Sequence, residues 1–150
     1  MITAYSPTDR PDCIRMFLDV YRGHPWNRDW LDEESVGRYF ADIERTPCFN
    51  GFVFKAGDRM AGFCFGVTSD YFLGKSFEIT EIVIARALQR QGAGSRFLAL
   101  IEQRLIREGT TVVTLATEAE TVAHSFYLKN NYHAADKAIY LYKNLNIQEG

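Results

Sequence analysis

Apolar residues recur along this chain at two spacings, and each spacing predicts a different kind of element. Repeats at helical spacing predict helices over 9–23, 31–45, 92–108 and 120–132. Runs rich in β-branched and aromatic residues predict strands instead. These strands lie at 2–6, on both sides of a turn at Ala56-Gly57-Asp58 within 50–71, and at 77–85, 111–117 and 138–145. The resulting order, βααβββαβαβ, predicts an α/β (α+β) fold with a mixed sheet and helices on its faces.

Residues with special backbone or capping properties mark the predicted helix ends. Asp29 precedes the second helix and can cap its first N–H groups. Gly23 and Gly109 follow the first and third helices, where glycine is favoured. The fourth helix ends at Asn130-Asn131, and asparagine tolerates a positive φ better than most residues.

The length and composition are those of one ordinary globular domain. The chain has 150 residues, of which 47% are hydrophobic and 24% are charged, so we predict a single domain over 1–150. No apolar run approaches the roughly 20 residues that are needed to span a bilayer. The start of the chain has neither the basic nor the apolar region of an export signal. These features predict a cytoplasmic protein without a membrane partner.

The charge balance and the cysteines count against further classes of function. A formal net charge of -2 provides no broad basic field, so we expect no nucleic-acid partner. The cysteines Cys13, Cys48 and Cys64 lie far apart and form no C-x-x-C pair, which argues against a disulfide framework and a zinc site. The histidines show no metal-ligand spacing either, so we expect no bound metal.

A turn that contains two glycines, QRQGAGS at 89–95, joins the predicted strand at 77–85 to the predicted helix at 92–108. The first N–H groups of a helix have no partner within it, and Gly92 and Gly94 leave room for a ligand to approach them. Such a helix N-terminus is typical of a binding site for a phosphate or pyrophosphate. Two better-known phosphate loops are absent, because no G-x-x-x-x-G-K-[ST] motif occurs and Phe97 replaces the last glycine of G-x-G-x-x-G. The glycines can also simply shape a tight turn, and the turn by itself leaves both readings open.

Two motifs together resemble those of the GNAT superfamily of acyl-CoA-dependent N-acyltransferases. QRQGAG (89–94) resembles the Q/R-x-x-G-x-G/A signature that follows a strand in this family. AHSFYLKNNY (123–132) resembles its A-x-x-x-Y-x-x-x-G-F motif, with Tyr127 at the tyrosine position and Asn131 and Tyr132 in place of glycine and phenylalanine. Glu120 stands where relatives often carry asparagine. The resemblance covers essentially the whole chain and implies a mostly antiparallel central sheet, acetyl-CoA as cosubstrate and transfer of its acetyl group to an amine.

The resemblance also implies which residues hold acetyl-CoA. The turn and the first helical residues would hold its pyrophosphate, and strand backbone would pair with its pantetheine arm where the fourth strand diverges from the fifth. The pyrophosphate residues are Gln89, Arg90, Gln91, Gly92, Ala93, Gly94 and Ser95, and the pantetheine residues are Ile82, Val83 and Ile84.

Glu81 and Tyr127 are the predicted catalytic residues. A lysine-like amine, with a pKa of about 10.4, is almost entirely protonated at neutral pH, so a carboxylate that removes its proton through water is useful. Glu78 and Glu81 are three residues apart, on opposite faces of a regular strand; without a bulge only one can face the substrate, and we favour Glu81. Tyr127 can protonate the leaving thiolate. A backbone N–H such as that of Ile84 can stabilise charge on the carbonyl oxygen.

By the same resemblance, the acceptor amine is predicted to bind beside the connection between the first two helices and the end of the preceding hairpin. Trp26 and Asn27 belong to the connection, Tyr71 belongs to the hairpin, and Glu78 is on the strand beside them. Nearby acidic residues would suit a cationic amine, but they can equally be the solvated start of a helix. They are Asp29, Asp32, Glu33, Glu34 and Asp70. The acceptor, whether a small molecule or a protein terminus or lysine, stays open, as does the choice between monomer and homodimer.

Two other functions stay open from the sequence. A non-catalytic acyl-CoA sensor or interaction module would keep the phosphate-binding turn without turnover. A nucleotide-binding domain of another fold is suggested only by the glycine turn, and the missing P-loop lysine and ribose-binding acid count against it.

Overall fold

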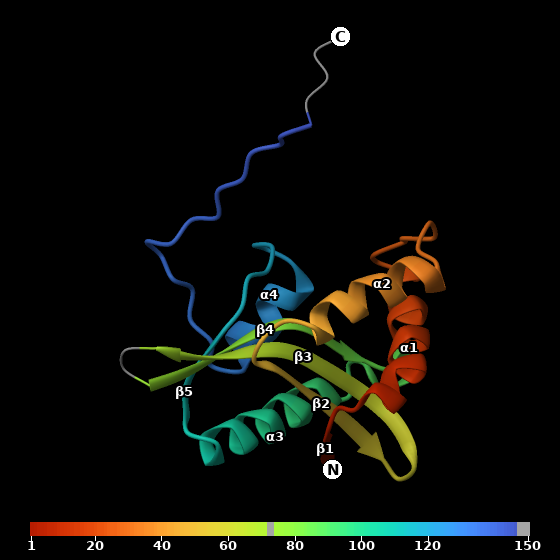
Figure 1. The fold of residues 1–150 in the computed structure, drawn as a ribbon, viewed down its shortest axis with the longest axis horizontal. Coiled ribbons are helices and arrows are strands. Elements are labelled where there is room, and N and C mark those ends of the chain that lie inside the picture. Colours follow the sequence, from red (N-terminus) through yellow and green to blue (C-terminus); the bar gives the residue numbers. More distant parts are fainter. Residues whose placement is uncertain (72–73, 147–150) are drawn as a thin grey trace. The chain divides into compact units, whose positions relative to one another are not determined.

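A five-stranded sheet is the centre of the first part of the protein, counted over the residues that the structure describes (Figure 1). The computed structural model describes residues 1–71 and 74–146. The chain divides into two compact units, Met1–Ala116 and Thr117–Gly150, and the expectation of one domain over 1–150 stays a prediction. The first unit contains β1 (Ile2–Ala4), α1 (Arg10–Arg22), α2 (Glu33–Glu44), β2 (Phe49–Ala56), β3 (Arg59–Tyr71), β4 (Gly74–Ile84), α3 (Ala93–Arg107) and β5 (Thr110–Thr114), with short 3-10 turns at Pro7–Asp9 and Arg86–Leu88.

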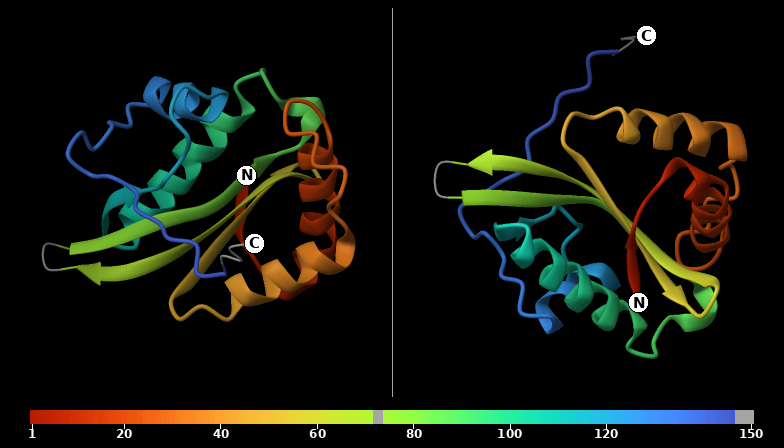
Figure 2. Two further views of the ribbon diagram at one scale, coloured as in Figure 1. Left: turned by 90° about the horizontal axis from the view of Figure 1, so that it is seen from above. Right: turned by 60° about the horizontal axis from the view of Figure 1, so that its bottom comes forward.

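The strands follow one another across the sheet in the order β1-β2-β3-β4-β5. Neighbouring strands are antiparallel except β4 and β5, which are parallel because α3 carries the chain back between them. The expected mixed, mostly antiparallel sheet is therefore confirmed. Gly57 forms the turn between β2 and β3 with φ of +64°, as the predicted hairpin requires. Figure 2 shows the hairpin of β3 and β4 reaching beyond the ends of β1 and β2.

Helices cover both faces of the sheet, with α1 and α2 on one face and α3 on the other (Figure 1). Phe40 of α2 is fully buried against Phe63 and Phe65 of β3, with ring centroids 5.7 and 5.0 Å away. On the other face, Phe97 of α3 stacks on Phe54 of β2 at 5.1 Å. Each such burial contributes about 1.5–3 kcal/mol. These contacts fix both helix layers against the strands that carry the predicted site.

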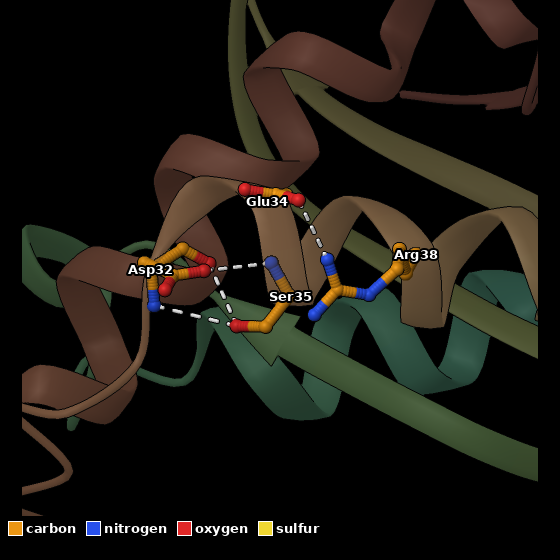
Figure 3. A network of polar contacts seen from close by, with 4 residues as sticks. All are labelled: Asp32, Glu34, Ser35 and Arg38. Carbon is orange, nitrogen blue, oxygen red and sulfur yellow. Dashed lines mark hydrogen bonds and ion pairs between the residues drawn. The ribbon is translucent and has the colours of Figure 1, made fainter.

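The start of α2 differs from the prediction, because Asp32 rather than Asp29 caps the helix (Figure 3). Asp32 has an extended backbone, and its Oδ1 accepts a hydrogen bond of 2.7 Å from the Ser35 N–H. One turn further along, Arg38 donates to Glu34 at 2.9 Å. Two of the five acidic residues that were considered for a substrate rim therefore stabilise the start of α2 instead.

The second unit contains α4 (Val122–Lys129), whose N-terminus is capped by the Thr121 hydroxyl accepting from the His124 N–H. Asn131 follows the helix with φ of +69°, which confirms the expected left-handed residue. The strand predicted at 138–145 is wrong, since these residues form no strand in the structure. Alternating apolar residues favour an extended backbone, but a strand also needs a pairing partner, and the described part of this unit contains no other strand.

Candidate active site

Among the described residues, no strand pairs with the last residues of β4 on the edge that faces β5. The pairing with β5 ends at Glu78 and Thr114, while β4 continues to Ile84. On the other edge, the Ala85 N–H donates to the Ala61 carbonyl at 2.8 Å. Because antiparallel hydrogen bonding alternates along a strand, the polar backbone groups of Ile82 and Ile84 point away from β3, whereas those of Val83 point toward it. Only two of the three predicted pantetheine residues thus present backbone groups at this edge.

The N-terminus of α3 follows this edge directly and has unpaired donors. The first intrahelical hydrogen bond that the structure records runs from the Arg96 N–H to the Gly92 carbonyl, at 3.1 Å. The N–H groups of Ala93, Gly94 and Ser95 therefore lack a partner in the helix, and no side chain caps it. Gly92 has φ of +78°, and a Cβ built there meets no atom within 4 Å. The glycine is thus needed for its backbone conformation, and the space beside it is open.

The two glutamines of the turn shape it rather than point into that space. Gln89 donates through Nε2 to the Ile84 carbonyl at 3.0 Å, and Gln91 donates to the Ala87 carbonyl at 2.9 Å. Arg90 has φ of +64°, a left-handed conformation that is costly for a non-glycine residue. The two glutamines hold the turn closed against the end of β4, which places the open helix end next to the open strand edge.

A bulge in β4 brings both predicted glutamates to one face of the sheet. The pairing with β3 shifts from Phe65–Glu81 to Gly66–Ile79, which leaves Thr80 as an additional residue. Cross-strand partners point to the same face; Glu81 lies opposite Phe65, and Glu78 lies opposite Val67, two residues further along the same strand. Since Phe65 belongs to the core under α1 and α2, both carboxylates face those helices. Regular strand geometry predicts opposite faces, and the bulge removes that restriction.

Glu81 lies among aromatic side chains of α1 and α2. The Tyr39 hydroxyl donates to its Oε1 at 2.6 Å, and the Tyr21 side chain lies nearby. Burial raises the pKa of the Glu81 carboxyl above its ordinary value, and the Tyr39 hydrogen bond, the charge of Arg28 and the nearby Tyr21 hydroxyl partly offset the rise. Burial likewise raises the pKa of Tyr21 to about 12, so this hydroxyl stays protonated at neutral pH. The site therefore holds a carboxylate that is more basic than usual and is oriented by the Tyr39 hydroxyl.

The predicted acceptor residues Trp26 and Asn27 lie in the connection between α1 and α2. The Trp26 ring packs on Tyr21 at a centroid distance of 5.2 Å, and the Arg28 guanidinium lies over both rings. Asn27 has φ of +51° and donates to the Pro25 carbonyl at 3.3 Å. Tyr71 is the last residue of β3, at the tip of the hairpin, where it pairs with Gly74. Thus Trp26 belongs to the same cluster as Glu81, whereas Asn27 stabilises its own loop.

Tyr127 lies in the second unit, on α4. Its ring packs against Phe126 and Tyr132, with centroids 5.1 and 5.3 Å away, and its carbonyl accepts from the Tyr132 N–H at 3.0 Å. The motif residues Tyr127 and Tyr132 are thus in mutual contact across the end of the helix. Its role as an acid stays a prediction.

Comparison with known proteins decides the family. The family model described as "Acetyltransferase (GNAT) family" matches residues 11–132, which is most of the chain. The chain belongs to the GNAT acetyltransferase family. Proteins of this family use acetyl-CoA as a cosubstrate. No curated protein sequence matches the chain.

Solved structures share this GNAT fold at low sequence identity. A possible acetyltransferase from Clostridium difficile 630 has a TM-score of 0.79 and 14% identity, over 97% of this chain and 98% of its own. A GNAT family acetyltransferase from Staphylococcus aureus has a TM-score of 0.69 and 16% identity, over 97% and 98%. An aminoglycoside acetyltransferase from an uncultured soil metagenomic sample, in complex with sisomicin, has a TM-score of 0.71 and 18% identity, over 97% and 96%. The likeness shows the fold.

Three residues of this candidate site are absent from the sequence-based set, namely Tyr21, Tyr39 and Arg28. The two tyrosines lie on amphipathic helices, where an aromatic residue is expected to pack in the core. Their polar tips are the only signal of another role, because a buried tyrosine hydroxyl needs a partner. Arg28 shows no signal in the sequence pattern. Over the residues that the structure describes, no group of three or more metal-ligating side chains occurs, and no helix is long and apolar enough to cross a bilayer.

Proposed function

We propose that this protein is an N-acetyltransferase that moves the acetyl group of acetyl-CoA directly to a primary amine within a ternary complex. The observation that carries the proposal is the family match together with the unpaired N-terminus of α3 beside the unpaired edge of β4. The acetyl group passes from sulfur to nitrogen in one displacement through a tetrahedral intermediate. No covalent enzyme intermediate is required.

Acetyl-CoA binding is assigned to the end of β4 and the turn that follows it. The pantetheine arm hydrogen-bonds the backbone groups of Ile82 as a further strand would, while the Ile84 carbonyl stays bonded to Gln89 and the Ile84 N–H is left for the thioester. The pyrophosphate accepts hydrogen bonds from the N–H groups of Ala93, Gly94 and Ser95. The positive charges of Arg90 and Arg96 add to the electrostatic attraction. Each hydrogen bond to a charged group contributes about 1.5–3 kcal/mol, whereas the helix dipole contributes only about 0.3–1 kcal/mol. The donors therefore account for most of the binding.

Glu81 is assigned as the base. Removing the proton from a lysine-like ammonium group at neutral pH costs a free energy of roughly 4–5 kcal/mol. A carboxylate whose pKa is raised by burial accepts this proton more readily than an ordinary carboxylate, here through a water. Tyr39 orients this carboxylate by its hydrogen bond. Glu78, on the same face of the sheet, is the alternative base.

Two further groups complete the proposed reaction. The N–H of Ile84 stabilises the negative charge that develops on the thioester oxygen. Tyr127, by its position in the family motif, donates a proton to the coenzyme A thiolate as the carbon–sulfur bond breaks. The products are the acetylated amine and free coenzyme A.

Calorimetric titration with acetyl-CoA, with ATP and NAD as controls, tests the binding assignment first. We expect selective binding of acetyl-CoA, followed by release of free thiol with at least one member of a broad amine panel. Preferred binding of ATP or NAD would refute the assignment of the ligand. Binding without turnover of any amine would identify an acyl-CoA sensor in place of an enzyme.

A further inference from the structure

The connection between α1 and α2 fixes one arginine in a defined place. The Arg28 N–H donates to the Tyr21 carbonyl at 2.9 Å, and the Arg28 carbonyl accepts from the Leu31 N–H at 3.2 Å. Arg22 closes the same loop by donating to the Leu31 carbonyl at 3.0 and 2.6 Å. The guanidinium carbon of Arg28 lies 5.4 Å from the centroid of the Tyr21 ring and 5.7 Å from that of Trp26. Backbone and side chain are therefore both held.

The charge of Arg28 has no carboxylate partner among the described residues, although acidic residues are close in the sequence. Asp32 is used as the cap of α2 and Glu34 pairs with Arg38. Five other arginines form ion pairs, namely Arg10, Arg15, Arg38, Arg45 and Arg104. The aromatic rings of Tyr21 and Trp26 lie against the flat face of the Arg28 guanidinium. Its N–H donors lie in the guanidinium plane and stay available to an anion.

One tyrosine connects this cation with the proposed base. The ring of Tyr21 lies under the Arg28 guanidinium, while its hydroxyl end lies close to Glu81, which accepts from Tyr39. Tyr21 is thus a neighbour of both the cation and the carboxylate. They form no ion pair with each other in the described structure. A small molecule with charges of both signs can therefore contact the two groups at once.

We propose that Arg28 determines acceptor specificity by binding an anionic group, so that the acceptor is a primary amine that also carries a carboxylate or a phosphate. The amine lies beside Glu81 and the anion lies against the N–H edge of Arg28. This inference rests on the proposed function and names its substrate class. Polycationic amines are disfavoured, because they would place a second positive charge beside Arg28.

Matched pairs of amines test this specificity in steady-state turnover with acetyl-CoA. The pairs are phosphoethanolamine against ethanolamine and β-alanine against its amide, since each pair differs in the anionic group. We expect the anionic member to have the higher kcat/KM. Arg28→Gln should lower that value about 10- to 100-fold more for the anionic member than for the neutral member, because only the anionic member loses a hydrogen bond between charged groups. Arg45→Gln, which removes an exposed charge at the far end of α2, should change neither.

Calorimetric binding of the same amines to the protein saturated with coenzyme A separates the two proposals. Arg28-dependent binding of the anionic amines without turnover would refute the proposed function and support the assignment of Arg28. Three results would each overturn that assignment. The first is turnover or binding with no preference within each pair, and the second is an equal effect of Arg28→Gln on both members. The third is binding of no anionic amine.

Discussion

Gly92 offers the sharpest test of the cofactor assignment, because strain and charge can be changed there separately. Its φ of +78° is left-handed, and a Cβ would meet no protein atom within 4 Å. A non-glycine residue in this conformation costs about 1–2 kcal/mol. Gly57, in the turn between β2 and β3, has φ of +64° and the same open surroundings. It is therefore a matched control for the strain.

Substitution by alanine and by glutamate at both glycines separates the two effects. All four variants should lose about 1–2 kcal/mol of folding free energy, which lowers the melting temperature by about 2–8 °C for a chain of this size. Only Gly92→Glu brings a carboxylate to the N-terminus of α3. Two like charges about 4 Å apart repel by about 1 kcal/mol in water and about 4 kcal/mol at a partly screened surface. We therefore expect acetyl-CoA to bind roughly 10- to 100-fold more weakly to Gly92→Glu than to Gly57→Glu.

The assay is calorimetric titration of each folded variant with acetyl-CoA at low and high ionic strength. The loss in Gly92→Glu should shrink as salt is added, because salt screens exposed charges. Gly92→Ala should show the smaller change that strain alone causes. Equal affinity of the two glutamate variants would refute the assignment of the pyrophosphate to the α3 N-terminus.

Three further outcomes are expected. Tyr127→Phe should lower kcat by about 100-fold or more, the usual effect of losing a general acid, while the Kd of acetyl-CoA stays unchanged; unchanged turnover would remove its assigned role. The kcat/KM should fall as the pH drops through the pKa of Glu81, which burial raises above its ordinary value. Tyr39→Phe should move this fall in the pH profile to higher pH, because it removes a hydrogen bond that favours the carboxylate. An unchanged pH profile in Tyr39→Phe would contradict this. In chemical denaturation, Asp32→Ala should cost about 1 kcal/mol as a lost helix cap, and an equal loss in Asp29→Ala would contradict the cap assignment.

The sequence alone determined the periodic elements and the glycine turn. The helices at α1, α2 and α3 and the hairpin at Gly57 follow from local spacing and turn chemistry, which depend on neighbours in the chain. The left-handed Asn131 was predictable for the same reason. In contrast, the helix start at Asp29 and the strand at 138–145 were wrong. The capping aspartate is chosen by the backbone conformation of the loop, and a strand exists only where it finds a partner.

Only the tertiary structure decided how the candidate site is arranged. The motif residues were recognisable, but the bulge at Thr80 that turns Glu78 and Glu81 to one face depends on the register between β3 and β4, which no local pattern specifies. The contacts of Glu81 with Tyr39 join residues 42 positions apart in the chain. Such contacts arise when helices pack on the sheet and a partly buried carboxylate finds donors. The sequence therefore determined the elements and their motifs, and packing decided which polar groups meet.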